Sequence, residues 1–200
     1  MAKKKYYAVK NGRETGVFDS WAECEKQVKG FKNALYESFY TLDEANSYLG
    51  IAIEKNLPPD GTVYAYVDGS YNVSTDIYGY GIVLILPDGE VEEINGNGKN
   101  SDVSSMRNVA GELKGAFLSM QYAVNNGYKA LTIFHDYEGI AKWALHEWKA
   151  NLKETMAYRD FCDSISKIIS LNFVKVAAHT GIKYNELADK LAKKAIGIGE

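Results

Sequence analysis

The sequence predicts an α/β protein with a mixed five-stranded sheet covered by helices, preceded by a small α+β unit. Runs of β-branched and aromatic residues that alternate with small residues are typical of strands. From residue 62 three such runs follow one another directly, and two later runs are separated by helical patterns. This order favours a mixed sheet with helices packed on it. A segment with two adjacent prolines and no regular period divides this region from the first fifty residues.

The first fifty residues are interpreted as one compact unit. Strands are expected at 5–9, 14–18 and 33–39, and helices at 19–30 and 41–50. Asp19 or Ser20 is expected to cap the first helix, with Glu23 near the third helical position as in a capping box. Thr41 and Glu44 have the same spacing at the start of the second helix.

The region from residue 62 onward contains the remaining elements. Strands are expected at 62–71, 77–86, 90–97, 130–136 and 171–177, and helices at 104–126, 138–148, 153–169 and 185–196. Ser104 or Ser105 is expected to cap the longest helix. We therefore expect a first domain at 1–50, a linker at 51–61 and a second domain at 62–200.

Composition excludes several classes of protein. The 200 residues include only three prolines and no apolar run long enough to cross a membrane. Cys24 and Cys162 lie far apart without metal-ligand spacing, which favours reduced thiols and a cytoplasmic protein. No phosphate-binding loop or dinucleotide fingerprint is present, so no nucleotide cofactor is expected. The mildly acidic second half argues weakly against nucleic acid, unless bound cations reverse the local charge.

Two aspartates end expected strands. Asp68 shares a strand face with Tyr66, where an isolated carboxylate would be costly to keep ionised. It needs a cation or a hydrogen-bond donor there, unless it only opens an Asp-Gly turn. Asp136 shares its face with Phe134, so His135 points the opposite way. We therefore interpret His135 as a packed or surface residue rather than a metal ligand.

Two further carboxylates lie beside the apolar faces of expected helices. Glu112 is flanked by Gly111, Gly115 and Ala116, and such small neighbours let a helix pack closely and let a carboxylate face a sheet. A glutamate exposed to solvent is the alternative interpretation. Asp189 flanks the packed side of the last helix. Each of these residue types is common on its own, so they are informative only in combination.

The first unit resembles a known binding module. Residues 7–18, YAVKNGRETGVF, and then Trp21, Cys24 and Val28 resemble the RNA/DNA-hybrid-binding (viroplasmin-like) domain at the N-terminus of many ribonucleases H1. The resemblance implies that Trp21 and Tyr36 line an aromatic groove for the DNA strand. From the residues alone, the aromatic side chains of this unit could instead form its core.

The same resemblance concerns the charged residues of this unit. It implies that basic side chains, with Lys10 and Arg13 as candidates, hold backbone phosphates. Family members usually have a lysine just after the aromatic residue that Tyr36 represents, whereas this chain has Glu37. A lost phosphate contact weakens binding and flattens its salt dependence.

Four motifs of the larger region resemble the ribonuclease H active site in order, spacing and context. They are YVDGS at 66–70, RNVAGEL at 107–113, FHDY at 134–137, and HTG at 179–181 followed by NELAD at 185–189. The resemblance implies an RNase H-like fold and a site for two Mg²⁺ ions, for which Mn²⁺ can substitute. A cluster of carboxylates suits such hard cations, whereas thiols do not.

The resemblance also implies a role for each of these residues. Asp68 would bridge the two ions, Glu112 and Asp136 would hold one of them, and Asp189 would hold the ion on the side of the attacking water. His179 would assist proton transfer or product release.

Selection of a hybrid requires contacts to the 2′-hydroxyl groups of the RNA strand. Ser70, Asn72 and Asn108 are the candidates because they are polar and lie near the carboxylates in the sequence motifs. The basic helix insertion of some family members is not evident. Trp143 and Trp148 are interpreted either as core residues or as side chains that flank the DNA strand.

The expected function is that of an endoribonuclease. It would hydrolyse the RNA strand of RNA/DNA hybrids by two-metal-ion catalysis and leave 5′-phosphate and 3′-hydroxyl ends. We expect a monomer whose partner is the hybrid duplex and which does not interact with membranes. The alternatives are a hybrid-binding protein with an inactive nuclease fold, a related strand transferase, or a nuclease that cuts DNA.

Overall fold

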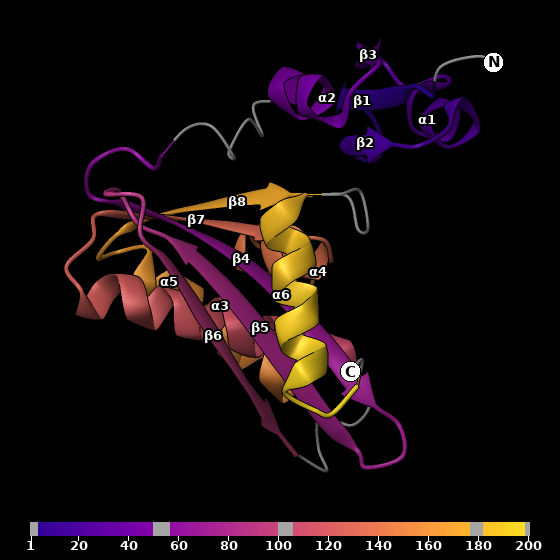
Figure 1. Ribbon diagram of the computed structural model, residues 1–200. Coiled ribbons are helices and arrows are strands. Elements are labelled where there is room, and N and C mark those ends of the chain that lie inside the picture. The colour runs from indigo at the N-terminus through magenta and orange to yellow at the C-terminus, as the bar shows by residue number, and fades with distance from the viewer. Residues whose placement is uncertain (1–3, 50–56, 100–105, 177–181, 199–200) are drawn as a thin grey trace. The chain divides into compact units, whose positions relative to one another are not determined.

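The computed structural model describes residues 4–49, 57–99, 106–176 and 182–198 (Figure 1). The chain separates into two compact units, Met1–Asn56 with Lys175–Ile182, and Leu57–Val174 with Lys183–Glu200. The predicted boundaries of the linker, 51–61, fall largely outside the described residues and stay a prediction. No helix of the described part is long and apolar enough to span a membrane.

The N-terminal unit is a three-stranded antiparallel sheet with a helix on each face. Its elements are β1 (Tyr6–Asn11), β2 (Gly16–Phe18), α1 (Trp21–Val28), β3 (Leu35–Phe39) and α2 (Leu42–Leu49), and the strand order is β2-β1-β3. Neighbouring residues of β1 face opposite helices: Ala8 packs with Ala45 of α2, and Val9 packs with Cys24 of α1.

The predicted starts of both small helices are confirmed. The Ser20 hydroxyl accepts a hydrogen bond from the backbone N–H of Glu23 and caps α1. At α2 the capping box is complete, because the Thr41 hydroxyl accepts from the Glu44 N–H and the Glu44 carboxylate accepts from the Thr41 N–H.

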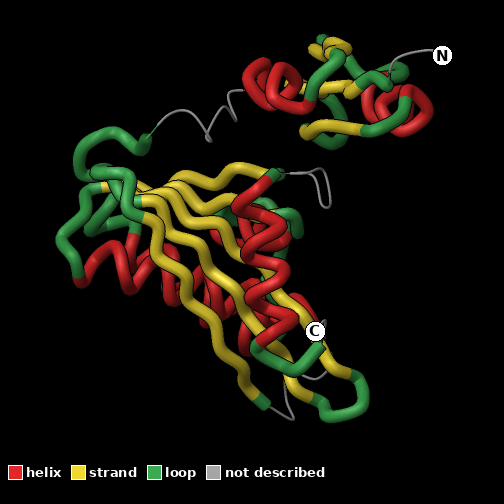
Figure 2. The backbone as a smooth tube through the Cα atoms, viewed as in Figure 1, coloured by secondary structure: helices red, strands yellow, loops and turns green. Residues whose placement is uncertain are grey.

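The larger unit is built on a mixed five-stranded sheet, as predicted (Figure 2). Its elements are β4 (Thr62–Asn72), β5 (Ile77–Ile85), β6 (Val91–Gly98), α3 (Asn108–Asn125), β7 (Ala130–His135), α4 (Gly139–Ala144), α5 (Lys153–Ile165), β8 (Ser170–Lys175) and α6 (Lys183–Lys194). The strand order is β6-β5-β4-β7-β8. Strand β5 is antiparallel to both of its neighbours, whereas β4 and β7 are parallel.

Helices cover both faces of this sheet (Figure 1). Val63, Ala65 and Val67 of β4 are fully buried in the core that includes Met120 of α3. Helix α6 packs on the opposite face, so close to β5 that a β-carbon on Gly81 would lie 2.0 Å from the Ala188 carbonyl oxygen. Asp68, described below, occupies one of the alternate positions of β4 that face α6.

Three helix ends differ from the prediction by four residues, and the other ends differ by less. The longest helix begins at Asn108 rather than at residue 104, with Arg107 at the N-cap; Ser104 and Ser105 lie outside the described residues. Helix α4 ends at Ala144 rather than at 148, because His146 adopts a left-handed backbone conformation with a φ of 61°. Helix α5 ends at Ile165 rather than at 169. Apolar periodicity continues past each end, so it does not mark where the backbone leaves the helix.

Candidate active site

Three carboxylate side chains meet where β7 ends. Asp68 belongs to β4, Glu112 lies in the second turn of α3, and Asp136 directly follows β7. One oxygen from each side chain lies within 4.8 Å of the other two. We call these three residues the carboxylate cluster. Three of the four predicted metal ligands are therefore adjacent in the structure.

Two parallel strands place the aspartates side by side. Tyr66 of β4 is in register with Phe134 of β7, and their rings stack with centroids 4.6 Å apart. Asp68 and Asp136 lie two residues further along and therefore project from the same face. Alternation predicted that Asp68 lies on the face of Tyr66 and Asp136 on the face of Phe134, and the register of β4 and β7 joins these two faces.

Close packing of α3 brings Glu112 to these aspartates. A β-carbon on Gly69 would lie 2.1 Å from the carbonyl oxygen of Asn108, so the first turn of α3 rests directly on the backbone of β4. Glu112 is only 1 % exposed and faces the sheet. The alternative of a solvent-exposed glutamate is thus wrong.

Burial and mutual repulsion make the cluster hard to ionise. Burial, followed by the charge of Asp136, raises the pKa of Asp68 from 3.8 to about 7. The Gly69 N–H, which donates to Asp68 Oδ1 at 2.7 Å, lowers this pKa only in part. Burial also raises the pKa of Glu112 well above its usual range, followed by the charges of Asp136 and Asp68.

A hard divalent cation fits this arrangement. Among the described residues Glu112 Oε2 is buried without a hydrogen-bond partner, so one strong acceptor remains available. The donors are carboxylate oxygens, which Mg²⁺ and Mn²⁺ prefer. Both cysteines are buried elsewhere, Cys24 in the N-terminal unit and Cys162 next to Met120. The donor set therefore does not resemble that of a structural zinc site.

Asp189, the fourth predicted ligand, lies beside the cluster but is not part of it. Its charge raises the pKa of Asp68, so the two carboxylates interact electrostatically. However, Asp189 Oδ2 accepts a hydrogen bond from Lys193 Nζ at 2.7 Å. The predicted role of Asp189 as a metal ligand is not tested by this geometry.

The structure describes only one of the two histidines in the motifs. His179 falls in 177–181, outside the described residues, so its predicted role stays a prediction. His135 is 1 % exposed, and its Nδ1 lies 2.9 Å from the Tyr137 carbonyl oxygen. The interpretation of His135 as a packed residue rather than a ligand is consistent with this position.

The candidate RNA contacts lie at the same end of the site. Asn108 is exposed at the first position of α3, and Ser70 is half-buried two residues beyond Asp68. Asn72 has a local partner, since its side-chain oxygen accepts from the Ser74 N–H at 3.0 Å. None of these contacts to a substrate is tested by the geometry.

An aromatic cluster next to Asp136 was not predicted as a unit. The rings of Tyr137, Trp143 and Trp148 all lie 5.8–6.2 Å from one another between centroids. Trp148 is 37 % exposed, whereas Trp143 is half-buried. The sequence singled out the two tryptophans, but nothing in it indicated that they pack against Tyr137.

In the N-terminal unit, three aromatic rings form a partly exposed row. Trp21 lies between Tyr7 and Tyr36, with centroid distances of 5.7 and 5.8 Å. Trp21 and Tyr36 are more than 40 % exposed, so they are not core residues. Strand alternation places Ser38 on the face of Tyr36 and Glu37 on the opposite face.

The two basic candidates of this unit have intramolecular contacts. The Arg13 guanidinium donates to the Lys26 and Lys29 carbonyl oxygens at 2.9 and 2.8 Å, so it closes the end of α1. Lys10 Nζ lies 5.6 Å from the centroid of the Tyr48 ring and remains exposed. Their predicted contacts to phosphates stay untested.

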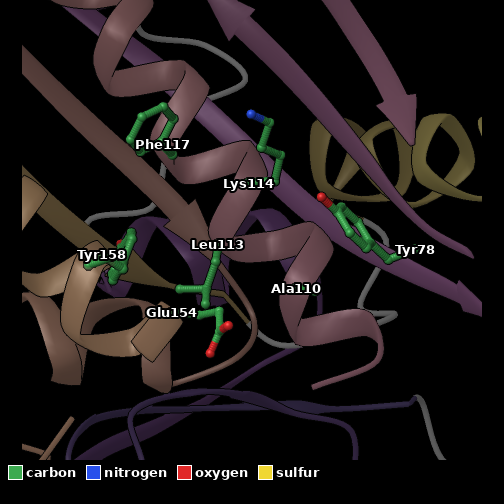
Figure 3. A pocket seen from close by; sticks show the side chains of 8 residues that line it. Tyr78, Ala110, Leu113, Lys114, Phe117, Glu154 and Tyr158 are labelled. Atoms are coloured by element: carbon green, nitrogen blue, oxygen red, sulfur yellow. The ribbon is translucent and has the colours of Figure 1, made fainter. Parts of the chain in front are cut away.

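A separate hollow of about 250 Å³ lies beside α3 (Figure 3). It is lined by Tyr78, Ala110, Leu113, Lys114, Phe117, Glu154, Ala157 and Tyr158. At about 100° per residue, the four α3 residues of the hollow are turned roughly 100–160° away from Glu112 around the helix. The hollow is therefore not part of the carboxylate site.

The sequence matches two family profiles. Residues 60–197 match the RNase H family, and residues 5–49 match the Ribonuclease H1 N-terminal domain. The first match covers more than half of the chain and contains the whole carboxylate cluster. The chain belongs to the RNase H family.

Individual relatives match different parts of this RNase H chain. A ribonuclease H of Saccharomyces cerevisiae is 47% identical over 45 residues, which are 22% of this chain and 13% of that protein. A ribonuclease H of Wolbachia pipientis wMel is 28% identical over 138 residues, 67% of this chain and 94% of that protein. The chain thus spans only a small fraction of the first relative and nearly all of the second.

Solved RNase H structures share the fold. RNase H1 from Halobacterium salinarum superposes with a TM-score of 0.57 at 21% identity, covering 68% of this chain and 98% of that one. LC11-RNase H1, solved in complex with an RNA/DNA hybrid, has a TM-score of 0.53 at 15% identity and covers 67% and 99%. At these identities the similarity concerns the fold alone.

Proposed function

We propose that this protein is an endoribonuclease that hydrolyses the RNA strand of RNA/DNA hybrids. The observation that carries the proposal is the convergence of Asp68, Glu112 and Asp136 within 4.8 Å in a chain of the RNase H family. The raised pKa values of Asp68 and Glu112 support it, because strongly shifted carboxylates are typical of sites that work on charged or metal-bound groups.

The proposed cofactor is a pair of Mg²⁺ ions, for which Mn²⁺ can substitute. Asp68 would bridge the ions, Glu112 and Asp136 would hold one, and Asp189 would hold the other. When bound, such ions lower the pKa of the attacking water and neutralise charge on the leaving 3′-oxygen. His179 would transfer a proton or assist product release, and the products would carry 5′-phosphate and 3′-hydroxyl ends.

Recognition of the hybrid is assigned to both units. Ser70, Asn72 and Asn108 would contact 2′-hydroxyl groups of the RNA strand near the cleaved bond. In the N-terminal unit, the exposed rings of Trp21 and Tyr36 would stack on the DNA strand. The protein would act as a monomer in the cytoplasm.

Cleavage of labelled duplexes tests the proposal. RNA/DNA, RNA/RNA and DNA/DNA duplexes of one sequence are incubated with Mg²⁺ or with EDTA, and each strand is labelled separately. We expect metal-dependent cutting of the RNA strand of the hybrid only. Tight hybrid binding without cutting, in both Mg²⁺ and Mn²⁺, would instead identify a hybrid-binding protein with an inactive nuclease fold. Cutting of the DNA duplex would identify a DNA nuclease.

A further inference from the structure

Lys193 is bonded to one oxygen of Asp189, the carboxylate proposed to hold the second metal ion. Its Nζ donates to Asp189 Oδ2 at 2.7 Å, and the side chains are 39 % and 21 % exposed. The two residues lie four positions apart on α6, so they share one face of the helix. Asp189 also lies within electrostatic reach of Asp68, so this ion pair is next to the carboxylate cluster.

Asp189 has a cationic partner on its own helix, since its carboxylate accepts a hydrogen bond from the Lys193 ammonium group. An ammonium hydrogen and a divalent cation use the same oxygen lone pairs. Lys193 and a metal ion therefore compete for Asp189 Oδ2, and their positive charges also repel each other.

We propose that Lys193 competes with the metal ion for the Asp189 carboxylate. It thereby weakens metal binding to Asp189 until the ion pair between Lys193 and Asp189 opens. The proposal rests on the metal-site part of the proposed function. A partly exposed ion pair four residues apart on a helix contributes little to stability, so a divalent cation can displace it. The freed ammonium then lies close to the site, where it can neutralise a phosphate of the substrate.

Mn²⁺ binding to the full chain without nucleic acid tests this proposal by a measurement that does not depend on activity. Titration calorimetry is done on wild type, Lys193→Met, Lys194→Met and Asp189→Asn at one pH and low ionic strength. The Mn²⁺ binding that is present in wild type and absent in Asp189→Asn is taken as binding to the Asp189 site. We expect Lys193→Met to tighten this site by about two- to fivefold, the range that a weak ion pair allows.

Matched controls separate competition from a general charge effect. Lys194 is the exposed neighbour of Lys193 and makes no ion pair within the described part of the chain, so Lys194→Met removes the same charge without freeing Asp189. We expect it to leave Mn²⁺ affinity unchanged, and we expect Lys193→Arg to behave like wild type. In the double variant Lys193→Met with Asp189→Asn, the gain should disappear.

Three results would overturn the proposal. They are equal gains in Lys193→Met and Lys194→Met, weaker Mn²⁺ binding in Lys193→Met, and a gain that persists without the Asp189 carboxylate. Each can occur in a protein that still cuts hybrids, so the competition can fail while the proposed function stands. Conversely, the wild-type protein could fail to cut the hybrid while Lys193→Met still tightens Mn²⁺ binding through Asp189. That result would refute the proposed function but would support the competition between Lys193 and the metal ion. Thermal unfolding followed by circular dichroism verifies that the variants fold.

Discussion

Gly111 of α3 lies directly against Gly79 of β5: a β-carbon at position 111 would lie 2.0 Å from the Gly79 carbonyl oxygen. No side chain can occupy this space without moving the helix away from the sheet. The next residue is Glu112, whose carboxylate must reach Asp68 and Asp136 across the same interface. The absence of a side chain at position 111 is thus a condition for the carboxylate cluster.

Gly111→Ala should therefore destabilise the fold and displace Glu112. The added methyl group meets rigid backbone rather than a flexible side chain, so we expect a loss of about 2–3 kcal/mol in the free energy of unfolding. Gly115→Ala is the matched control on the same helix, where the nearest atom is the Val67 side chain at 3.3 Å. Its strain is offset by better helix propensity, so we expect a change within about 1 kcal/mol.

Urea unfolding and hybrid cleavage measure the two effects. Gly111→Ala should lose stability and lower the cleavage rate, whereas Gly115→Ala should cut nearly as well as wild type. Equal stability of the two variants would show that α3 can shift at no cost, and would contradict the tight contact with β5.

Asp68→Asn separates stability from chemistry. The change removes a buried charge that repels Asp136, so the metal-free protein at about pH 8 should gain roughly 1–3 kcal/mol of stability. Hybrid cleavage in Mg²⁺ should fall by at least about a hundredfold, with hybrid binding retained. Asp60→Asn, an exposed position in the linker region, is the control and should change neither property. Wild-type cleavage by Asp68→Asn would refute the metal-site assignment.

Particular residues show how far the sequence predicted this site. Alternation along the strands was enough to place Asp68 on the face of Tyr66 and Asp136 on the face of Phe134, and the register of β4 and β7 joins these two faces. The small neighbours of Glu112 allowed it to face the sheet but did not exclude solvent, and the structure places it in the cluster. The ion pair of Asp189 with Lys193 was not predicted, although their spacing of four residues was a signal. Many such spacings on helices make no contact, because exposed side chains have several rotamers of similar energy.

Stability of the metal-free protein should fall as the pH rises. Burial and the charge of Asp136 raise the pKa of Asp68 from 3.8 to about 7, so between these values the folded chain keeps a proton that the unfolded chain has lost. Proton uptake then favours folding, and this contribution is fully present below 3.8 and lost as the pH rises through about 7. The raised pKa of Glu112 acts in the same direction.

Unfolding by urea in EDTA, at about pH 5 and about pH 8, measures this effect. We expect wild type to be more stable at the lower pH and Asp68→Asn to show a smaller difference. Mn²⁺ should stabilise the protein most at the higher pH, because it binds the deprotonated carboxylates. A wild-type stability that rises between these two pH values would contradict the pKa direction of both carboxylates.

Ser38→Lys should strengthen hybrid binding by the N-terminal unit more than Glu37→Lys does. Ser38 pairs with Tyr7 across the sheet and shares its face with Tyr36, so a lysine there would project beside the exposed row of Tyr7, Trp21 and Tyr36. One new phosphate contact should raise affinity several-fold and steepen the slope of log K against log salt by about 1. Glu37 faces α2, so its replacement changes the net charge more but adds no charge beside the rings. Fluorescence anisotropy of a labelled hybrid in EDTA, measured over a salt series, distinguishes the two variants. A larger gain in affinity for Glu37→Lys than for Ser38→Lys would place the bound strand on the other face of the sheet.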